Sequence, residues 1–339
     1  MYEEREIQFQ EAQALLKKCG LNPVDGADYR MGIFDEEDEL LATGALVGNM
    51  LQMIAVDPAC QGEDLSVRVV THLVSAAARR GIFCLYLFTK SSSVRFFEGI
   101  GFSVAAHVPG EVALLEWGAP GIRQYCRDLE ALRKQAFPCG GKGARVGVIV
   151  MNANPFTAGH RWLAEQAAAV CEHVFILAVE EDLSEFPFRV RLELIRQGTA
   201  DLANVTVLPG GRYVISSLTF PAYFSRDAAR ARLQSKIDAE IFAQYIAPAL
   251  GVTDRFLGEE PFSPSTAIYN EEVKARLEQS GLTVHILPRK AANGTAVSAS
   301  RVRQLLAEGR AEEALPLLPE TTAAYIRDHL QEVEQWVKK

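Results

Sequence analysis

Two short segments of the sequence carry residues that could bind the phosphate groups of a nucleotide. In the first, Thr157 and His160 stand at the expected start of a helix, where both side chains can donate hydrogen bonds to phosphate oxygens. The N-terminus of a helix adds unpaired N–H groups and a partial positive charge. Pro155 fixes one backbone angle of the preceding loop, Asn152–Gly159, and Gly159 allows main chain to approach a ligand closely. This loop is therefore suited to an anion.

The second segment, Val297–Arg303, lies much further along the chain. Ser298 and Ser300 can cap the start of a helix and offer hydroxyl and N–H groups to phosphate. Arg303 follows one turn later, from where its guanidinium can reach a terminal phosphate. Taken alone, the pattern also fits an ordinary capped helix. Its occurrence after the first segment, in this order, favours a phosphate site.

An alternation of strands and helices is expected to position both segments. The apolar run Val146–Met151 fits one buried strand of a parallel sheet, and the helix that opens at His160 carries Leu163, Ala167 and Val170 on one face. Repeated alternation predicts a Rossmann-like parallel sheet that binds ligands at the carboxyl ends of its strands. The further strands are expected at His173–Val179, Val205–Leu208, Asp254–Gly258 and Leu282–Leu287, with helices at Phe188–Leu202, Asp227–Ala247 and Ala267–Gln279.

Other polar residues are expected near the same edge of this sheet. The acidic run Glu180–Asp182 fits a solvated turn, and alternatively a site for Mg²⁺ or for the adenosine part of a nucleotide. Arg212 is a candidate phosphate or carboxylate ligand. Arg189 and Arg191 are two residues apart at a helix start, so we expect one to reach phosphate and the other to lie on the surface.

Composition and charge describe an ordinary globular protein. The chain has 339 residues, 48% hydrophobic and 23% charged, with a net charge of −8, which argues against a general nucleic-acid binder. Its six cysteines form no C-x-x-C pair, which favours reduced thiols over a zinc site or a disulfide framework. The acidic N-terminus lacks the apolar core of a signal peptide, and no run is long enough to span a bilayer. We therefore expect a cytoplasmic protein with no nucleic-acid or membrane partner.

Two domains are expected from the length and from a Gly/Pro-rich break at 137–143. The predicted division is a first α/β domain at residues 1–131, a linker at 132–143 and a nucleotide-binding domain at 144–339. In the first domain, strands are expected at Arg30–Phe34, Leu40–Val47, Leu51–Val56 and Phe83–Phe88, followed by a hairpin that ends near Trp117. Helices are expected at Glu11–Cys19, Leu65–Arg80, Ser93–Gly99 and Gly121–Ala136.

The first domain resembles the GNAT acetyltransferase fold. The resemblance lies in its element order and in the segments IAVDPACQGEDLS and SSSVRFFEGIGF. In that family a Gly-rich turn binds the pyrophosphate of coenzyme A; here Gly62 remains, but Asp64 and Ser66 stand where glycine is usual. Phe97 aligns with a tyrosine that often protonates the departing thiolate, and it has no proton to donate. The domain could hold a coenzyme-like thiol arm, or it could serve only structure or docking.

The two phosphate-binding segments resemble the T/H-x-G-H and I-S-S/T-S-x-x-R motifs of the nucleotidyltransferase superfamily. The stretches MNANPFTAGH, VEEDLSEFPFRVRLELI, SLTFPAYF, GEEPFSPSTAIYN and SASRVR, behind a GNAT-like domain, resemble the citrate (pro-3S)-lyase ligase family over nearly the whole chain. That family uses ATP and acetate to acetylate the thiol of the phosphoribosyl-dephospho-coenzyme A arm on the acyl carrier (gamma) subunit of citrate lyase. AMP and pyrophosphate are the products.

The resemblance implies a role for each matching residue. His160, Thr157 and Arg303 would be catalytic, and Mg²⁺ would accompany ATP. Nucleotide binding would fall to Asn154, Pro155, Phe156, Gly159, Ser298, Ser300 and Arg212. Two alternatives stay open: an adenylyltransferase that acts on a phosphate-bearing small molecule, and a non-catalytic nucleotide-sensing protein.

Overall fold

The computed structural model describes residues 2–23, 25–60, 62, 64–138, 140, 143–180, 184–214, 227–259, 264–289, 291–292 and 295–338. The chain forms two compact units. One comprises Met1–Tyr125 with Ser217–Ile241, and the other comprises Cys126–Ser216 with Phe242–Lys339. This division does not coincide with the predicted one, because residues 132–136 continue helix α4 (Ile122–Ala136) and residues 217–241 belong with the first unit.

The first unit is built on a seven-stranded sheet of order β1-β2-β3-β4-β5-β7-β6. Its neighbours are antiparallel except β4 and β5, which pair in parallel only where Met50 and Leu51 face Tyr86 and Leu87. The two strands therefore separate beyond that point. The sheet comprises β1 (Glu3–Glu6), β2 (Tyr29–Phe34), β3 (Leu40–Val47), β4 (Met50–Val56), β5 (Cys84–Lys90), β6 (Ser103–Val108) and β7 (Val112–Gly118), of which only β1 was not expected.

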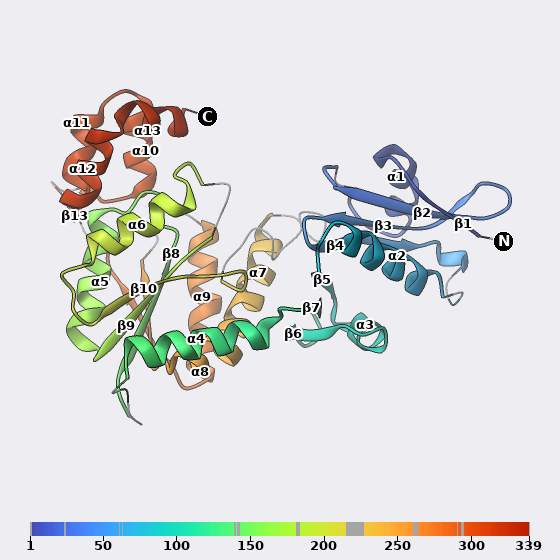
Figure 1. Ribbon diagram of the computed structural model, residues 1–339, viewed down its shortest axis with the longest axis horizontal. Coiled ribbons are helices and arrows are strands. Elements are labelled where there is room, and N and C mark those ends of the chain that lie inside the picture. Colours follow the sequence, from blue (N-terminus) through green and yellow to red (C-terminus); the bar gives the residue numbers. More distant parts are fainter. Residues whose placement is uncertain are drawn as a thin grey trace. The chain divides into compact units, whose positions relative to one another are not determined.

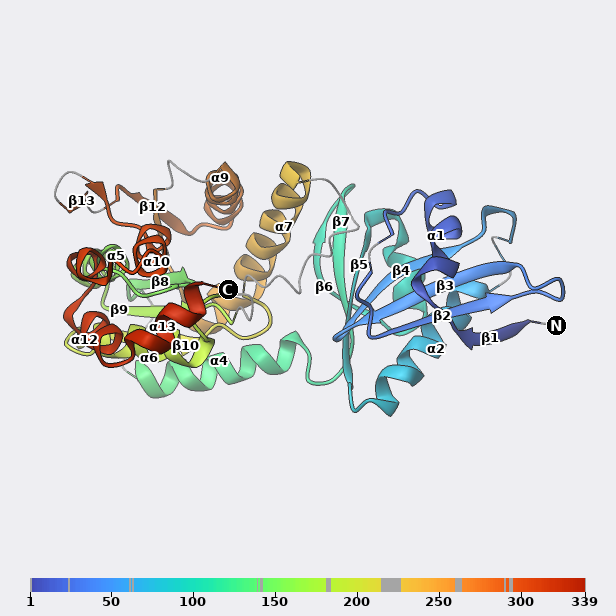
Figure 2. The same cartoon turned by 90° about the horizontal axis from the view of Figure 1, so that it is seen from above.

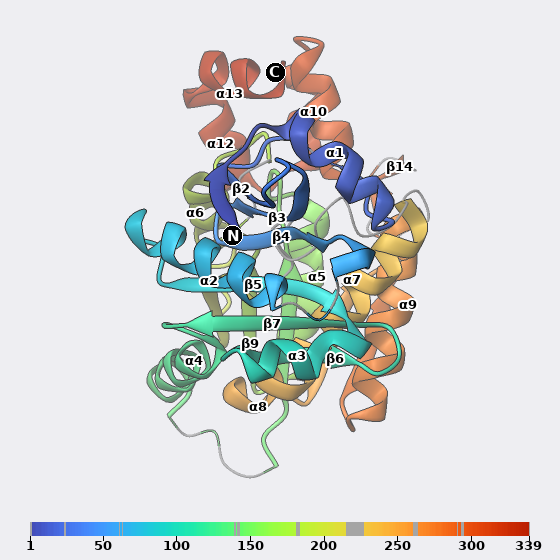
Figure 3. The same cartoon turned by 90° about the vertical axis from the view of Figure 1, so that its right-hand side faces the viewer.

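Helices α1 (Phe9–Lys18) and α2 (Leu65–Arg79) cover opposite faces of this sheet (Figure 2). Leu16 of α1 packs in one apolar cluster, and Leu73 of α2 packs in another. Alternate residues of a strand point to opposite faces, so the same strands contribute to both clusters. Short 3-10 turns occupy Pro58–Cys60 and Ser91–Ser93, and helix α3 (Val94–Gly99) lies against β6 and β7 (Figure 3).

Helix α7 (Asp227–Ile241) belongs to the first unit because it packs against β6 and β7. An ion pair of 2.6 Å between Lys236 Nζ and Glu111 Oε1 adds to this contact. The single helix predicted for Asp227–Ala247 is instead divided into α7, a π-helical turn (Phe242–Ile246) and α8 (Ala247–Leu250). Pro248 has no N–H to donate to the preceding turn, which favours such an interruption.

The second unit contains a five-stranded sheet of order β10-β9-β8-β11-β12, in which every pair is parallel. The predicted parallel sheet is therefore confirmed, and the switch between β8 and β11 is where such sheets bind ligands. Helices α5 (Ala158–Val170) and α6 (Phe188–Gly198) contribute to the apolar core on one face (Figure 1). The strands are β8 (Val146–Met151), β9 (His173–Ala178), β10 (Val205–Pro209), β11 (Asp254–Gly258) and β12 (Thr283–Leu287), and α9 (Pro264–Gln279) precedes β12.

The C-terminal region forms a group of helices that the sequence did not predict beyond the start of α10 (Figure 1). Buried Phe186, from the loop before α6, lies in their apolar cluster. Among the described residues, no helix combines the length and apolar character needed to cross a bilayer. A short hairpin, β13 (Ala291–Ala292) and β14 (Thr295–Ala296), is followed by α10 (Ala299–Ala307), α11 (Ala311–Ala314), a 3-10 turn (Leu315–Leu317), α12 (Glu320–Asp328) and α13 (Leu330–Val337).

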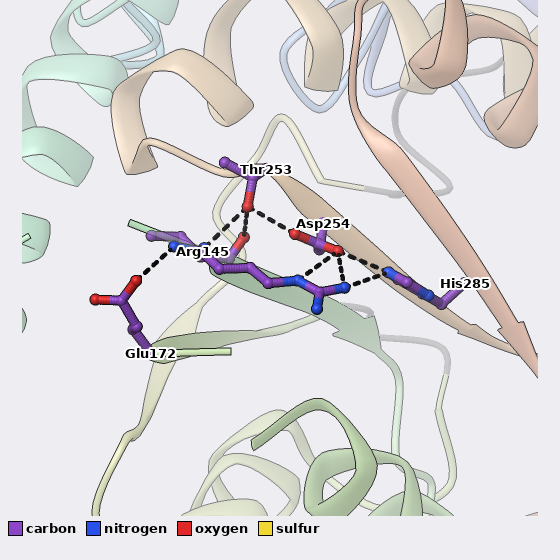
Figure 4. A network of polar contacts seen from close by, with 6 residues as sticks. Arg145, Glu172, Thr253, Asp254 and His285 are labelled. Carbon is purple, nitrogen blue, oxygen red and sulfur yellow. Dashed lines mark hydrogen bonds and ion pairs between the residues drawn. The ribbon is translucent and has the colours of Figure 1, made fainter. Parts of the chain in front are cut away.

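A polar network ties the amino ends of the strands of the second unit together (Figure 4). The guanidinium of Arg145 donates to Asp254 Oδ1 from Nη2 at 2.8 Å and from Nε at 3.1 Å, and His285 Nε2 lies 2.6 Å from the same oxygen. Burial alone would raise the pKa of Asp254, but hydrogen bonds from Arg145, His285 and Thr253 outweigh it and lower the pKa to about 2. The network stabilises the edge of the sheet opposite the expected site.

Candidate active site

The loop between β8 and α5 ends in a capping box. Thr157 is the N-cap of α5, and its Oγ1 accepts a hydrogen bond from the backbone N–H of His160 at 3.4 Å. In return, the backbone N–H of Thr157 donates to His160 Nδ1 at 3.0 Å. Glutamate or glutamine usually occupies this third position of a capping box. Here the imidazole does so, and the helix start therefore fixes the orientation of the His160 ring.

The same contacts determine the protonation of His160. Because Nδ1 accepts the N–H of Thr157, the neutral ring carries its proton on Nε2. Burial, and then the positive charge of Arg289, lower the pKa of His160 to about 4. The ring stacks on Phe156, which is fully buried, with 5.8 Å between ring centroids. His160 is therefore neutral at pH 7, with an N–H available as a hydrogen-bond donor.

The second segment begins a helix beside the first. Ser298 is the N-cap of α10, and its Oγ accepts from the backbone N–H of Arg301 at 3.2 Å. A Cβ atom at Gly159 would lie 3.6 Å from the carbonyl oxygen of Val297. The first turn of α5 and the residue before the α10 cap are thus in contact. Two helix N-termini, each with a partial positive charge, lie close together.

Arg303 joins the two segments directly. Its Nη1 donates to the backbone oxygen of Asn154 at 2.7 Å, and its Nε donates to Glu185 Oε1 at 2.9 Å. The other carboxylate oxygen of Glu185 accepts from Asn154 Nδ2, and Asn154 Oδ1 accepts from the backbone N–H of Phe186 at 3.0 Å. We call Asn154, Glu185 and Arg303 the Arg303 clamp. It connects residues that are distant in sequence.

The structure places the remaining predicted site residues at different distances from this centre. Pro155 follows a cis peptide bond, and Ser300 is exposed on the first turn of α10. Arg212 is exposed after β10, and its role as a ligand stays a prediction. Thr157 is only 2% exposed, and its hydroxyl and N–H are engaged with His160, so the described contacts give it a positioning role.

Arg191 has a structural role that the sequence did not indicate. It is fully buried, and its Nη1 donates to the backbone oxygens of Asn152 at 2.7 Å and Val179 at 2.9 Å. These bonds join the ends of β8 and β9. Arg189 is exposed, as expected for one member of the pair. Of the predicted acidic run, Glu180 accepts from the backbone N–H of Gly211 at 3.0 Å, whereas Glu181 and Asp182 lie outside the described residues.

Sequence reasoning missed two charged residues of the site. Glu185 forms part of the Arg303 clamp, and Arg289 follows β12 and donates from Nε to the backbone oxygen of Glu259 at 3.0 Å. A basic residue two positions after a predicted strand could have indicated Arg289, because such positions lie at the ligand-binding edge of the sheet. No local pattern pointed to Glu185.

In the first unit, the turn that departs from the GNAT pattern is only partly described. Gly62 and Asp64 both adopt positive φ angles, of 103° and 56°, while Gln61 and Glu63 lie outside the described residues. The Asp64 side chain makes no capping hydrogen bond to α2. Phe97 is 7% exposed and packs edge-on against Phe102 in the core. A core aromatic ring at this position fits the expectation that no proton donor is available there.

Comparison with known proteins covers nearly the whole chain. Residues 146–326 match the family model for the citrate lyase ligase C-terminal domain. Two similar curated proteins are the citrate (pro-3S)-lyase ligases of Klebsiella pneumoniae and Escherichia coli. The first is 40% identical over 88% of this chain and 87% of its own length, and the second is 39% identical over 88% and 85%.

Among solved structures, the chain is similar to a GNAT-family acetyltransferase from Staphylococcus aureus, at 12% identity and a TM-score of 0.31 over 35% of this chain and all of that one. It is also similar to an acetyltransferase from Bacillus cereus, at 13% identity and a TM-score of 0.30 over 35% of this chain and 99% of that one.

Proposed function

The chain belongs to the citrate (pro-3S)-lyase ligase family, and from that premise we propose that it uses ATP and acetate to acetylate a carrier thiol. The thiol would be that of the phosphoribosyl-dephospho-coenzyme A arm on the acyl carrier (gamma) subunit of citrate lyase. Acetyl-adenylate would be the intermediate, with AMP and pyrophosphate as products. Its curated relatives are named as ligases, so the protein is an enzyme of this family.

One observation carries the nucleotide site: Arg303 donates to the backbone oxygen of Asn154 at 2.7 Å. This contact brings the end of the β8 loop and the first turns of α10 to one place. The N-termini of α5 and α10 then offer N–H groups and positive potential to the same anion, as a triphosphate requires. His160 contributes an N–H donor, and Arg303 a cation.

The first step would be an in-line displacement at the α-phosphorus of ATP. An oxygen of acetate forms the new bond to phosphorus as the bond to the bridging oxygen breaks and pyrophosphate departs. His160, neutral at pH 7, donates from Nε2 to an α-phosphate oxygen, where negative charge grows in the transition state. Arg303 and the N-terminus of α10 stabilise the departing pyrophosphate. No side chain of the protein acts as nucleophile.

Mg²⁺ would neutralise charge on the phosphate oxygens. The described residues contain no cluster of three His, Cys, Asp or Glu side chains that could hold a metal ion by themselves. In other nucleotide sites Mg²⁺ is commonly bound through substrate phosphates together with one or two carboxylates. Glu180, two residues after β9, lies at the ligand-binding edge of the sheet and is the carboxylate that we propose to assist.

In the second step the carrier thiol, with loss of its proton, attacks the acyl carbon of acetyl-adenylate and AMP departs. The first unit is the proposed holder of the arm, because the divergence of β4 and β5 leaves backbone groups of both strands unpaired with each other beyond Leu51 and Leu87. Disrupting this function should abolish thiol acetylation and spare acetyl-adenylate formation.

The deciding measurement is acetate-dependent exchange of labelled pyrophosphate into ATP. Wild-type protein should catalyse it, and His160→Ala should lower the rate by about 10²-fold or more, because one transition-state donor is lost. His107→Ala, a histidine of the first unit, serves as the control and should leave the exchange rate unchanged. Exchange that does not depend on acetate would favour an adenylyltransferase, and ATP binding without any exchange would favour a nucleotide sensor.

A further inference from the structure

We infer that Glu185 is a positioning residue that holds the Arg303 guanidinium in its phosphate-binding orientation. The inference deepens the proposed function and rests on it for the identity of the phosphate ligand. Its basis is the Arg303 clamp, in which the Glu185 carboxylate accepts from Arg303 Nε through one oxygen and from Asn154 Nδ2 through the other. Both carboxylate oxygens therefore accept a hydrogen bond, and Glu185 bridges Arg303 and Asn154.

Glu185 has the geometry of a support rather than that of a ligand. A carboxylate beside a triphosphate is repelled by it, so direct contact with the nucleotide would weaken binding. Arg303 donates from Nε to Glu185 and from Nη1 to the backbone oxygen of Asn154. Within the described residues it makes no other hydrogen bond, so the N–H groups of Nη2 stay available. The carboxylate thus fixes one edge of the guanidinium and leaves the other edge for phosphate.

The Asn154 side chain of the clamp is itself held in place. Asn154 Oδ1 accepts the N–H of Phe186, which directs its Nδ2 group toward Glu185. Asn154 belongs to the same loop as Thr157 and His160. The clamp therefore fixes the position of Arg303 relative to His160, the proposed donor to the α-phosphate. A long flexible arginine otherwise loses much rotational freedom when it binds. Prior ordering by Glu185 removes part of that cost from the nucleotide-binding step.

The test compares Glu185→Gln and Glu185→Ala with Glu313→Gln. Glutamine keeps the shape, but its NH₂ group must face a donor of Asn154 or Arg303, so one bond of the clamp is lost. Glu313 Oε1 lies 2.7 Å from Arg310 Nε at α11, and this arginine–glutamate pair serves as a matched control outside the clamp. We expect both Glu185 variants to lower kcat for acetate-dependent exchange by about 10- to 100-fold. The KM for acetate and the Tm should stay near wild type, and Glu313→Gln should show no loss.

A double-mutant cycle separates positioning from a general effect on structure. If Glu185 acts through Arg303, then Glu185→Gln added to Arg303→Ala should cause no further loss. Independent, multiplying losses would overturn the inference. So would an unchanged rate in Glu185→Gln, or a gain in ATP affinity, which would mean that the carboxylate competes with phosphate for Arg303.

Pyrophosphate binding, measured by calorimetry, tests the role of Glu185 independently of the proposed reaction. Arg303→Ala and Glu185→Gln should both weaken pyrophosphate binding, and the combined variant should bind no more weakly than Arg303→Ala. Failure of acetate-dependent exchange in wild type would reject the ligase chemistry only. Pyrophosphate binding that is unaffected by Glu185→Gln would reject the role of Glu185 whatever the reaction.

Discussion

Replacing His160 with glutamine should make the stability of the protein less sensitive to mild acid. The folded state lowers the pKa of His160 from 6.5 to about 4, so the unfolded chain binds this proton more readily across that interval. The free energy of unfolding of the wild type therefore falls as pH drops from about 6.5 towards 4. Glutamine has no such titration. It also suits this position, because its side-chain oxygen can accept the N–H of Thr157 in the capping box.

The size of the effect follows from the two pKa values. Between pH 7.5 and pH 5.5 the wild type should lose about 1.4 kcal/mol relative to His160→Gln, and by pH 4.5 the loss should reach about 2.5 kcal/mol. Near neutral pH the two proteins should differ little, since the cap is retained. The variant should nevertheless exchange pyrophosphate about 10²-fold more slowly, because the imidazole donor is missing.

Urea unfolding of both proteins at pH 7.5, 5.5 and 4.5 measures this difference directly. The variant provides its own control, because all other titrating groups are shared. A stability difference that stays constant across the three pH values would mean that His160 titrates normally. The activity profile gives a second check: a step in the wild-type exchange rate near pH 6.5 that is absent in the variant would contradict a histidine that is already neutral there.

Three further substitutions test the packing and charge of the second unit. Asp254→Asn should lower the free energy of unfolding at pH 7 by about 2.5 kcal/mol, and the difference from wild type should shrink as pH falls from about 4 to 2, where the carboxylate is protonated; urea titration at pH 7 and pH 3 would show it. Arg255 is 1% exposed, and its Nε and Nη1 have no hydrogen-bond partner in the part of the chain described, so Arg255→Met should raise the unfolding free energy by about 1 kcal/mol or more. A loss of stability would show that the contact of the guanidinium with the Phe242 ring, 4.7 Å from its centroid, outweighs the cost of burying the charge. Gly198→Ala would place a Cβ atom in steric overlap with Phe156 Cε1 and should cost about 1–3 kcal/mol by thermal unfolding, whereas Gly99→Ala, which has open space, should be near neutral; equal effects of the two would contradict the packing argument.

The parts of the fold that could be predicted are those with a local signal. The strand Val146–Met151 has the expected bounds, because a strand buried on both faces of a parallel sheet is a continuous apolar run. The strand Asp254–Gly258 also has the expected bounds, although it begins with the charged residues Asp254 and Arg255. The single long helix expected after Asp227 was wrong from Phe242 onward, where a π-helical turn replaces the α-helix. Its grouping with the first unit depends on contacts such as Lys236 with Glu111, which no periodicity encodes.

The candidate site divides in the same way. The residues Thr157, His160, Ser298 and Arg303 were found from motif and spacing, since each lies at a helix start. The low pKa of His160 was not predictable, because it depends on burial and on the charge of Arg289, which is brought near only by the fold. Glu185 was missed for the same reason. Its partner Arg303 is distant in sequence, and an isolated glutamate in a loop has no pattern of its own.

Phe186 links the C-terminal helices to the candidate active site. Its backbone N–H holds Asn154, while its ring meets Trp336 edge-on at 5.6 Å within the apolar cluster of the last helices. Phe186 thus supports both the C-terminal helices and the loop of the proposed nucleotide site. Truncation or destabilisation of the C-terminal helices should therefore lower activity as an active-site substitution would, without removing any residue that contacts ATP.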